Sequence, residues 1–70
     1  MSGTQDRLVY MANQIARNFA VQGEAAAIAA TARHILDFWD PRMREAILAG
    51  DRAGLSDIAA GAIARLQASP

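Results

Sequence analysis

Cysteine is absent from this 70-residue chain, and histidine occurs once. Without cysteine the chain can form no disulfide, and it cannot hold zinc or an iron–sulfur cluster through thiolates. A single histidine gives no basis for a histidine-rich metal site. We therefore expect no metal and no cofactor. Because a core of this size rarely contributes more than about 3–5 kcal/mol, tight packing or a protein partner must supply the rest of the stability.

Clustered positive charge is also missing. The seven basic residues are all arginines, they are scattered along the chain, and seven acidic residues balance them. Nucleic-acid binding requires concentrated positive charge, and a helix lying on a membrane needs a basic polar face. The N-terminal residues do not form a basic and then apolar leader, and no apolar run approaches the roughly 18 residues of a membrane span. The sequence predicts no nucleic-acid or membrane partner, and a cytoplasmic location.

Apolar residues recur at helical spacing along the chain, with no strand-like alternation. The fold class we expect is all-α, a compact bundle of three to four short helices. It should form one domain over residues 1–70 with an ordered core at about 5–67. The expected helices span 5–22, 24–38, 41–49 and 57–67.

Polar residues and glycines mark the ends of these helices. Thr4, Asp40 and Ser56 are expected N-caps, because a side-chain oxygen there can accept a free helical N–H. Pro41 suits the first helical position and pushes Asp40 out of the helical conformation. The expected stops are Gly23 and Gly50.

Each expected helix has one apolar stripe. The stripe of helix 24–38 covers about half of its circumference, which is typical of a central helix with several neighbours. The expected inward residues are Leu8, Met11, Ala12, Ile15 and Phe19; Ala25, Ile28, Thr31, Ala32, Ile35, Leu36, Phe38 and Trp39; Met43, Ala46 and Ile47; and Leu55, Ile58, Ala59, Ala62, Ile63 and Leu66.

The residues that could carry chemistry have simpler explanations. Asp37 and Asp40 resemble an acid–base pair, but no nucleophile or oxyanion donor lies nearby in the sequence. His34 fits a partly buried structural or interface position, and Ser56 fits a cap. The glycines 50, 54 and 61 are isolated and form no phosphate-binding loop. We expect no catalytic site and no small-molecule substrate.

The densest segment is 38–44, Phe-Trp-Asp-Pro-Arg-Met-Arg. In one interpretation its aromatic residues fill the core, Asp40 and Pro41 make the turn, and both arginines are solvated. In the other, Trp39 presents a preformed corner to a partner together with Arg42 and Arg44, since Trp and Arg are enriched in interface hot spots. Phe38, Asp40, Pro41 and Met43 would build that corner.

Some apolar side chains have no expected internal contact. On the expected helix 41–49, Leu48 lies on the same side as Arg44, away from Met43 and Ile47. The outer side of helix 5–22 also carries apolar residues. Such surface is typical of a protein interface. The predicted partner-binding residues are Trp39, Arg42, Arg44, Leu48, Tyr10, Arg17 and Val21.

Three strings together resemble a known family. They are Leu-Val-Tyr-Met-Ala-Asn-Gln-Ile at 8–15, the segment 38–44, and Gly-Leu-Ser at 54–56. From about Leu8 to Leu66 the chain is similar to the delta subunit of soluble NAD-dependent formate dehydrogenase. The resemblance implies a cofactor-free accessory subunit of a molybdenum- or tungsten-dependent complex. That complex oxidises formate to carbon dioxide and passes electrons through iron–sulfur clusters and FMN to NAD. The delta subunit would bind the catalytic alpha subunit and help its assembly or stability.

Two other functions stay open from the sequence. Short helices joined by tight turns also describe a helix-turn-helix nucleic-acid-binding protein, although the neutral net charge and dispersed arginines count against it. A small enzyme acting alone would need a catalytic constellation, which the sequence does not display.

Overall fold

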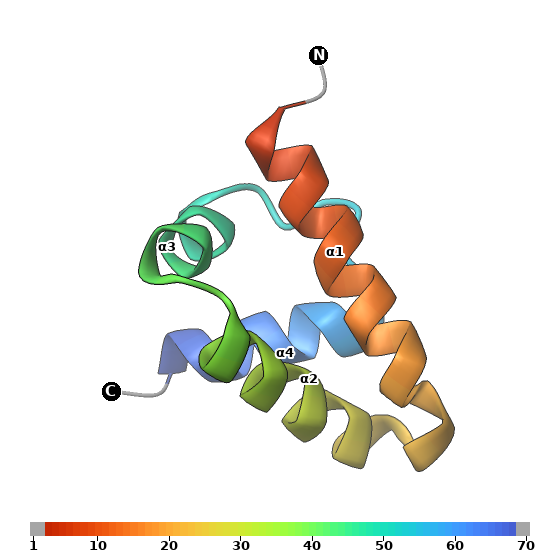
Figure 1. The fold of residues 1–70 in the computed structure, drawn as a ribbon. Helices are drawn as coiled ribbons and strands as arrows, with labels where there is room; N and C mark the ends of the chain where they lie inside the picture. Colours follow the sequence, from red (N-terminus) through yellow and green to blue (C-terminus); the bar gives the residue numbers. More distant parts are fainter. Residues whose placement is uncertain (1–2, 69–70) are drawn as a thin grey trace.

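The computed structural model describes residues 3–68, which fold into four α-helices and one 3₁₀ turn (Figure 1). The helices are α1 (Thr4–Phe19), α2 (Glu24–Phe38), α3 (Pro41–Ala49) and α4 (Asp57–Ala68), and the 3₁₀ turn η1 (Ala20–Gln22) follows α1. No strand occurs within residues 3–68, so the all-α prediction is confirmed. The single domain expected over 1–70 includes four terminal residues that lie outside the described ones.

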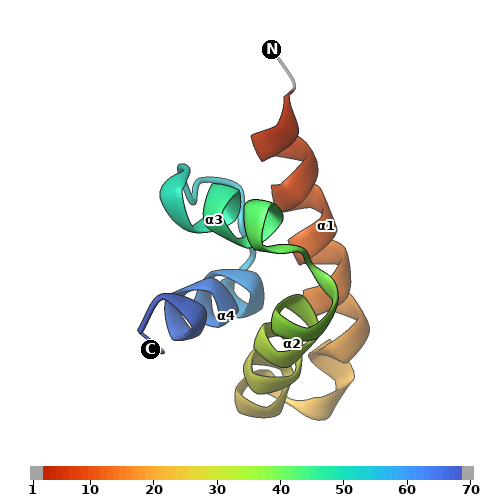
Figure 2. The ribbon, with the colours of Figure 1, turned by 60° about the vertical axis from the view of Figure 1, so that its left-hand side comes forward.

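The helices surround one small core. α2 and α4 lie side by side, and α1 packs against both (Figures 1 and 2). α3 contacts α1 and α4 near the C-terminal end of α2. Each helix therefore buries one face against at least two others, which is how short helices reach a common core.

The start and end of α1 differ from the prediction. Gly3, in an extended conformation, is the N-cap, and its carbonyl accepts the first helical bond from the N–H of Arg7 at 3.1 Å. Thr4 is already helical, so its predicted capping role is wrong. The regular helix ends at Phe19, and the 3₁₀ turn tightens the chain before Gly23, whose φ of 96° ends the segment. Such tightening is common at helix C-termini.

The other predicted helix ends are confirmed. Asp40 Oδ1 accepts a hydrogen bond from the backbone N–H of Met43 at 3.0 Å, and Pro41 occupies the first position of α3. Gly50 is the C-cap of α3. The Ser56 hydroxyl accepts from the N–H of Ala59 at 3.2 Å at the start of α4.

The core draws on all four helices. Its buried cluster consists of Leu8, Ala12, Ala16, Ile35, Trp39, Ile47, Ala59 and Ile63. The inward positions predicted for α3 and α4 are buried or half-buried, which confirms them. The stripe of α2 is narrower than predicted: Ala25, Leu36 and Phe38 are exposed. The predicted width assumed that half of the circumference of α2 is covered, whereas Leu36 and Phe38 lie at the open edges of grooves and keep much of their surface exposed.

α2 and α4 approach closely where Gly61 faces Ile28. A Cβ built on Gly61 would lie 2.8 Å from Ile28 Cδ1, closer than real Cβ contacts. Small residues on α2, among them the buried Ala27 and Ala32, help this approach.

Candidate functional site

The side chain of Asn13, in the string at 8–15, forms hydrogen bonds with the string at 54–56. Asn13 Nδ2 donates to the carbonyl of Gly54 at 2.9 Å, and Asn13 Oδ1 accepts from the N–H of Ser56 at 2.8 Å. Gly54 has a φ of 92°, a left-handed conformation that other residues adopt only with strain. Asn13 thus fixes the loop before α4 to the middle of α1. This role was not predicted from the sequence. A polar amide directly after the inward-facing Ala12 could have suggested that Asn13 hydrogen-bonds to another part of the chain.

Residues of the strings at 8–15 and 38–44 together line an open groove, which we call the aromatic groove. Its volume is about 480 Å³. It is lined by Tyr10, Met11, Gln14 and Ile15 of α1, by His34 and Phe38 of α2, and by Trp39 and Met43. Two of its aromatic side chains face solvent, with Phe38 74% and Tyr10 64% exposed. Large exposed aromatic residues are enriched in protein interfaces.

The exposed Phe38 ring is held in place. Its centroid lies 4.7 Å from the centroid of the His34 ring, which in turn lies 6.3 Å from that of Phe19 in an edge-on arrangement. Such aromatic contacts restrict the rotation of each ring. Phe38 therefore forms a defined part of the groove wall, and His34 is a half-buried structural support, as the sequence suggested.

Trp39 lies in the core beneath this groove. Only 5% of the residue is exposed, which corresponds to the interpretation in which Trp39 fills the core. The exposed member of the aromatic pair is Phe38. The chain leaves α2 at Trp39, and this change of direction turns the indole inward while Phe38 stays on the outside.

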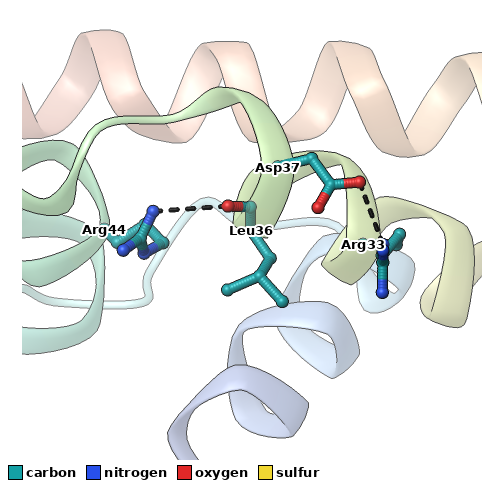
Figure 3. Close-up of polar contacts among 4 residues, drawn as sticks. All are labelled: Arg33, Leu36, Asp37 and Arg44. Carbon is teal, nitrogen blue, oxygen red and sulfur yellow. Dashed lines mark hydrogen bonds and ion pairs between the residues drawn. The ribbon is translucent and has the colours of Figure 1, made fainter.

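Arg44 has an internal role that the sequence analysis did not anticipate. Its guanidinium donates to the carbonyl of Trp39 at 2.7 Å and to that of Leu36 at 3.4 Å (Figure 3). It therefore caps the C-terminus of α2, where unpaired carbonyls and the helix dipole favour a cation. The expectation that Arg44 is free for a partner is wrong for this half-buried side chain.

Leu48 also has internal contacts. It packs, half-buried, against the core cluster, so the expectation that it lacks an internal partner is wrong. The prediction from the sequence counted Met43, Ala46 and Ile47 as the buried side of α3 and left Leu48 outside it. In the structure α3 contacts both α1 and α4, which gives it a wider buried side.

Four predicted partner-binding residues are exposed: Tyr10, Arg17, Val21 and Arg42. Tyr10 lines the aromatic groove, and Arg17 lines a second groove of about 590 Å³ together with Asn13 and Gly54. Val21 follows them in η1. Whether any of these four contacts a partner stays a prediction.

The acidic side chains within residues 3–68 have structural roles or stand apart from one another. No group of three or more histidine, aspartate or glutamate side chains there is arranged to hold a metal ion. Asp37 forms an ion pair with Arg33 at 2.9 Å, and Asp40 is the N-cap of α3. Both carboxylates that resembled an acid–base pair in the sequence thus have structural contacts. No helix in this range has both the length and the apolar character needed to cross a membrane.

The comparison with protein families assigns the chain. The family model of the NADH-dependent formate dehydrogenase delta subunit, FdsD, matches residues 7–63. The chain belongs to the FdsD family. The matched range runs from the first turn of α1 into α4 and contains all three strings that carry the resemblance. Neither a curated protein nor a solved structure gives a significant match.

Membership of FdsD implies a formate dehydrogenase delta subunit that works in a complex with other subunits. It favours the subunit prediction over the helix-turn-helix protein and over the enzyme acting alone. The cytoplasmic location expected from the sequence stays a prediction.

Proposed function

We propose that this FdsD-family chain is a non-catalytic accessory subunit that binds the catalytic alpha subunit of the formate dehydrogenase complex. Binding would stabilise the alpha subunit or help its assembly. The observation that carries the proposal is the family match over residues 7–63, which includes every residue of the buried core cluster.

The aromatic groove supports a protein partner as its occupant. Covering an exposed aromatic or large aliphatic side chain stabilises a complex by about 1.5–3 kcal/mol before the costs of association. Phe38 and Tyr10 would both be covered by a surface that fills the groove. Because residues of two family-like strings build this groove, we propose that the alpha subunit docks there.

The remaining predicted residues divide into two groups under this proposal. Arg42, at the start of α3 and exposed, would contact the alpha subunit beside Phe38, and Arg17 and Val21 would extend the contact along α1. Trp39 would act from beneath by fixing the position of Phe38. Arg44 and Leu48 would act in the same indirect way through α3.

Affinity capture of the tagged chain, co-expressed with the alpha subunit, tests the proposal. Wild type should retain the alpha subunit, and changing Tyr10 and Phe38 together to Ala should weaken retention by about tenfold or more, since interface aromatics carry much of the binding energy. Asn18→Ala is the matched control, because Asn18 is exposed on α1 but lines neither groove.

A helical melt of each variant separates lost docking from lost folding. If wild type retains no alpha subunit, the proposed function is wrong. If the folded double variant retains as much alpha subunit as wild type does, the aromatic groove is not the docking site.

A further inference from the structure

Four of the seven arginines lie in the second half of α2, in α3, in the loop that follows it and near the end of α4. Arg33 and Arg65 line a shallow groove of about 230 Å³ with Leu36 and Leu66. Arg44 reaches the carbonyl of Leu36. Arg52 donates hydrogen bonds to the carbonyl of Leu48 and to the side chain of Gln67, the residue after Leu66. We call this surface the basic face, defined by Arg33, Leu36, Arg44, Arg52, Arg65 and Leu66.

The charge of the basic face is unbalanced. Within residues 3–68 one carboxylate, Asp37, pairs with these four arginines, through Arg33. The chain as a whole carries seven basic and seven acidic residues. The remainder therefore holds three arginines and six acidic residues. The arginines that are scattered in the sequence thus include four that contribute to the basic face, of which one is paired with a carboxylate in the described part of the chain.

Two of the four guanidinium groups are available to a ligand. Arg44 and Arg52 are half-buried and donate to groups of the chain itself. Arg33 and Arg65 are exposed and line the same groove as Leu36, itself 49% exposed, and Arg33 pairs with Asp37 through Nε. In Figure 3 the Leu36 side chain points toward α4, with Arg44 to one side and the Arg33–Asp37 pair to the other.

An apolar floor beside two exposed guanidinium groups, one of which pairs with Asp37 through Nε, suits an acidic peptide better than a nucleic acid. A guanidinium binds a carboxylate through two parallel hydrogen bonds, and its stem packs on apolar surface. A phosphate backbone gains its affinity from many charge contacts and makes no use of an exposed leucine. We propose that the basic face binds an acidic segment of a partner protein, with carboxylates on Arg33 and Arg65 and an apolar side chain on Leu36 and Leu66.

This inference rests on the proposed function, in which the partner is a subunit of the formate dehydrogenase complex. Leu36 and Phe38 are two residues apart on α2, and so they lie about 200° apart around the helix axis. One flat surface cannot cover both the basic face and the aromatic groove. The subunit would then lie between two protein segments, one apolar and one acidic.

Two substitutions at the same ion pair provide the test. Arg33→Gln and Asp37→Asn both break the pair, but the first removes positive charge from the basic face and the second adds to it. Loss of an exposed pair at this spacing barely changes folding stability. A purely structural role predicts the same effect from both variants, whereas binding of an acidic segment predicts opposite effects.

The measurement is the dissociation constant of the chain for the formate dehydrogenase complex prepared without it, from about 50 to about 300 mM NaCl. Arg33→Gln combined with Arg65→Gln should weaken binding by about tenfold at low salt and flatten its salt dependence. Asp37→Asn should bind as tightly as wild type or more tightly, with a steeper salt dependence. Leu36→Ala should weaken binding several-fold at every salt concentration.

The possible failures are distinguishable. No wild-type binding overturns the proposed function and this inference together. Wild-type binding that the double arginine variant leaves unchanged, or that Arg33→Gln and Asp37→Asn weaken equally, overturns only the inference. Wild-type binding to duplex DNA or to phosphatidylglycerol vesicles that is tighter than binding to the complex, and that the double variant loses, overturns it in favour of a polyanion.

Discussion

Replacing Asn13 by Ala should destabilise the fold measurably. The change removes the two hydrogen bonds that Asn13 makes with Gly54 and Ser56, which are 41 and 43 residues away in sequence. Each such bond contributes about 0.5–1.5 kcal/mol net. Alanine returns about 0.6 kcal/mol through its higher helix propensity, so we expect a loss of about 1–2 kcal/mol. For a domain of this size, that lowers the melting temperature by about 4–16 °C.

A thermal melt followed by circular dichroism at 222 nm measures this effect on the purified chain. Gln14→Ala is the control, because Gln14 is an exposed neighbour on α1 with no side-chain hydrogen bond recorded. Asn13→Asp should also lower the melting temperature, because its second oxygen would face the Gly54 carbonyl where Asn13 now donates. The reasoning is refuted if Asn13→Ala melts within about 1 °C of wild type, or if Gln14→Ala loses as much.

Four further predictions concern stability and use the same melt. Trp39→Ala should cost about 3–5 kcal/mol, comparable to the whole stability of so small a domain, and a melt like that of wild type would place the indole outside the core. Asp40→Ala should cost about 0.5–2 kcal/mol through the lost cap, and no change would mean that the bond to Met43 contributes nothing. Arg44→Ala should cost about 1–2 kcal/mol while the exposed Arg42→Ala stays within about 0.5 kcal/mol, and equal effects would contradict the capping role of Arg44. Gly61→Val should cost about 1–3 kcal/mol by overpacking Ile28, and adding Ile28→Ala should recover part of the loss.

The features predicted correctly from the sequence depend on near neighbours in the chain. Asp40 and Pro41 specify a helix start because the cap oxygen and the N–H that it accepts are three residues apart. Ser56 works in the same way with Ala59. Gly50 ends α3 as a local breaker should. Helix periodicity likewise identifies the face of α4 that becomes buried.

The features that the sequence did not reveal depend on how the helices are placed in space. The Asn13 bonds require the loop before α4 to lie against the middle of α1. Arg44 can cap α2 only because α3 folds back over its last turn. Phe38 has the same apolar character as Trp39, and only the direction in which the chain leaves α2 decides which of them is buried. The exposed aromatic residue of segment 38–44 is therefore Phe38 and not Trp39, and the role of this segment in partner binding stays a prediction.

The position of α4 has a consequence for how the protein is made. Ala59 and Ile63 of α4 belong to the same buried cluster as Leu8 and Ile35. A growing chain that has reached only Gly50 lacks these two contacts, so its earlier helices cannot complete their packing. Until residue 63 has left the ribosome, apolar side chains stay open to chaperones and proteases. A premature stop before α4 should therefore leave no stable fragment in the cell.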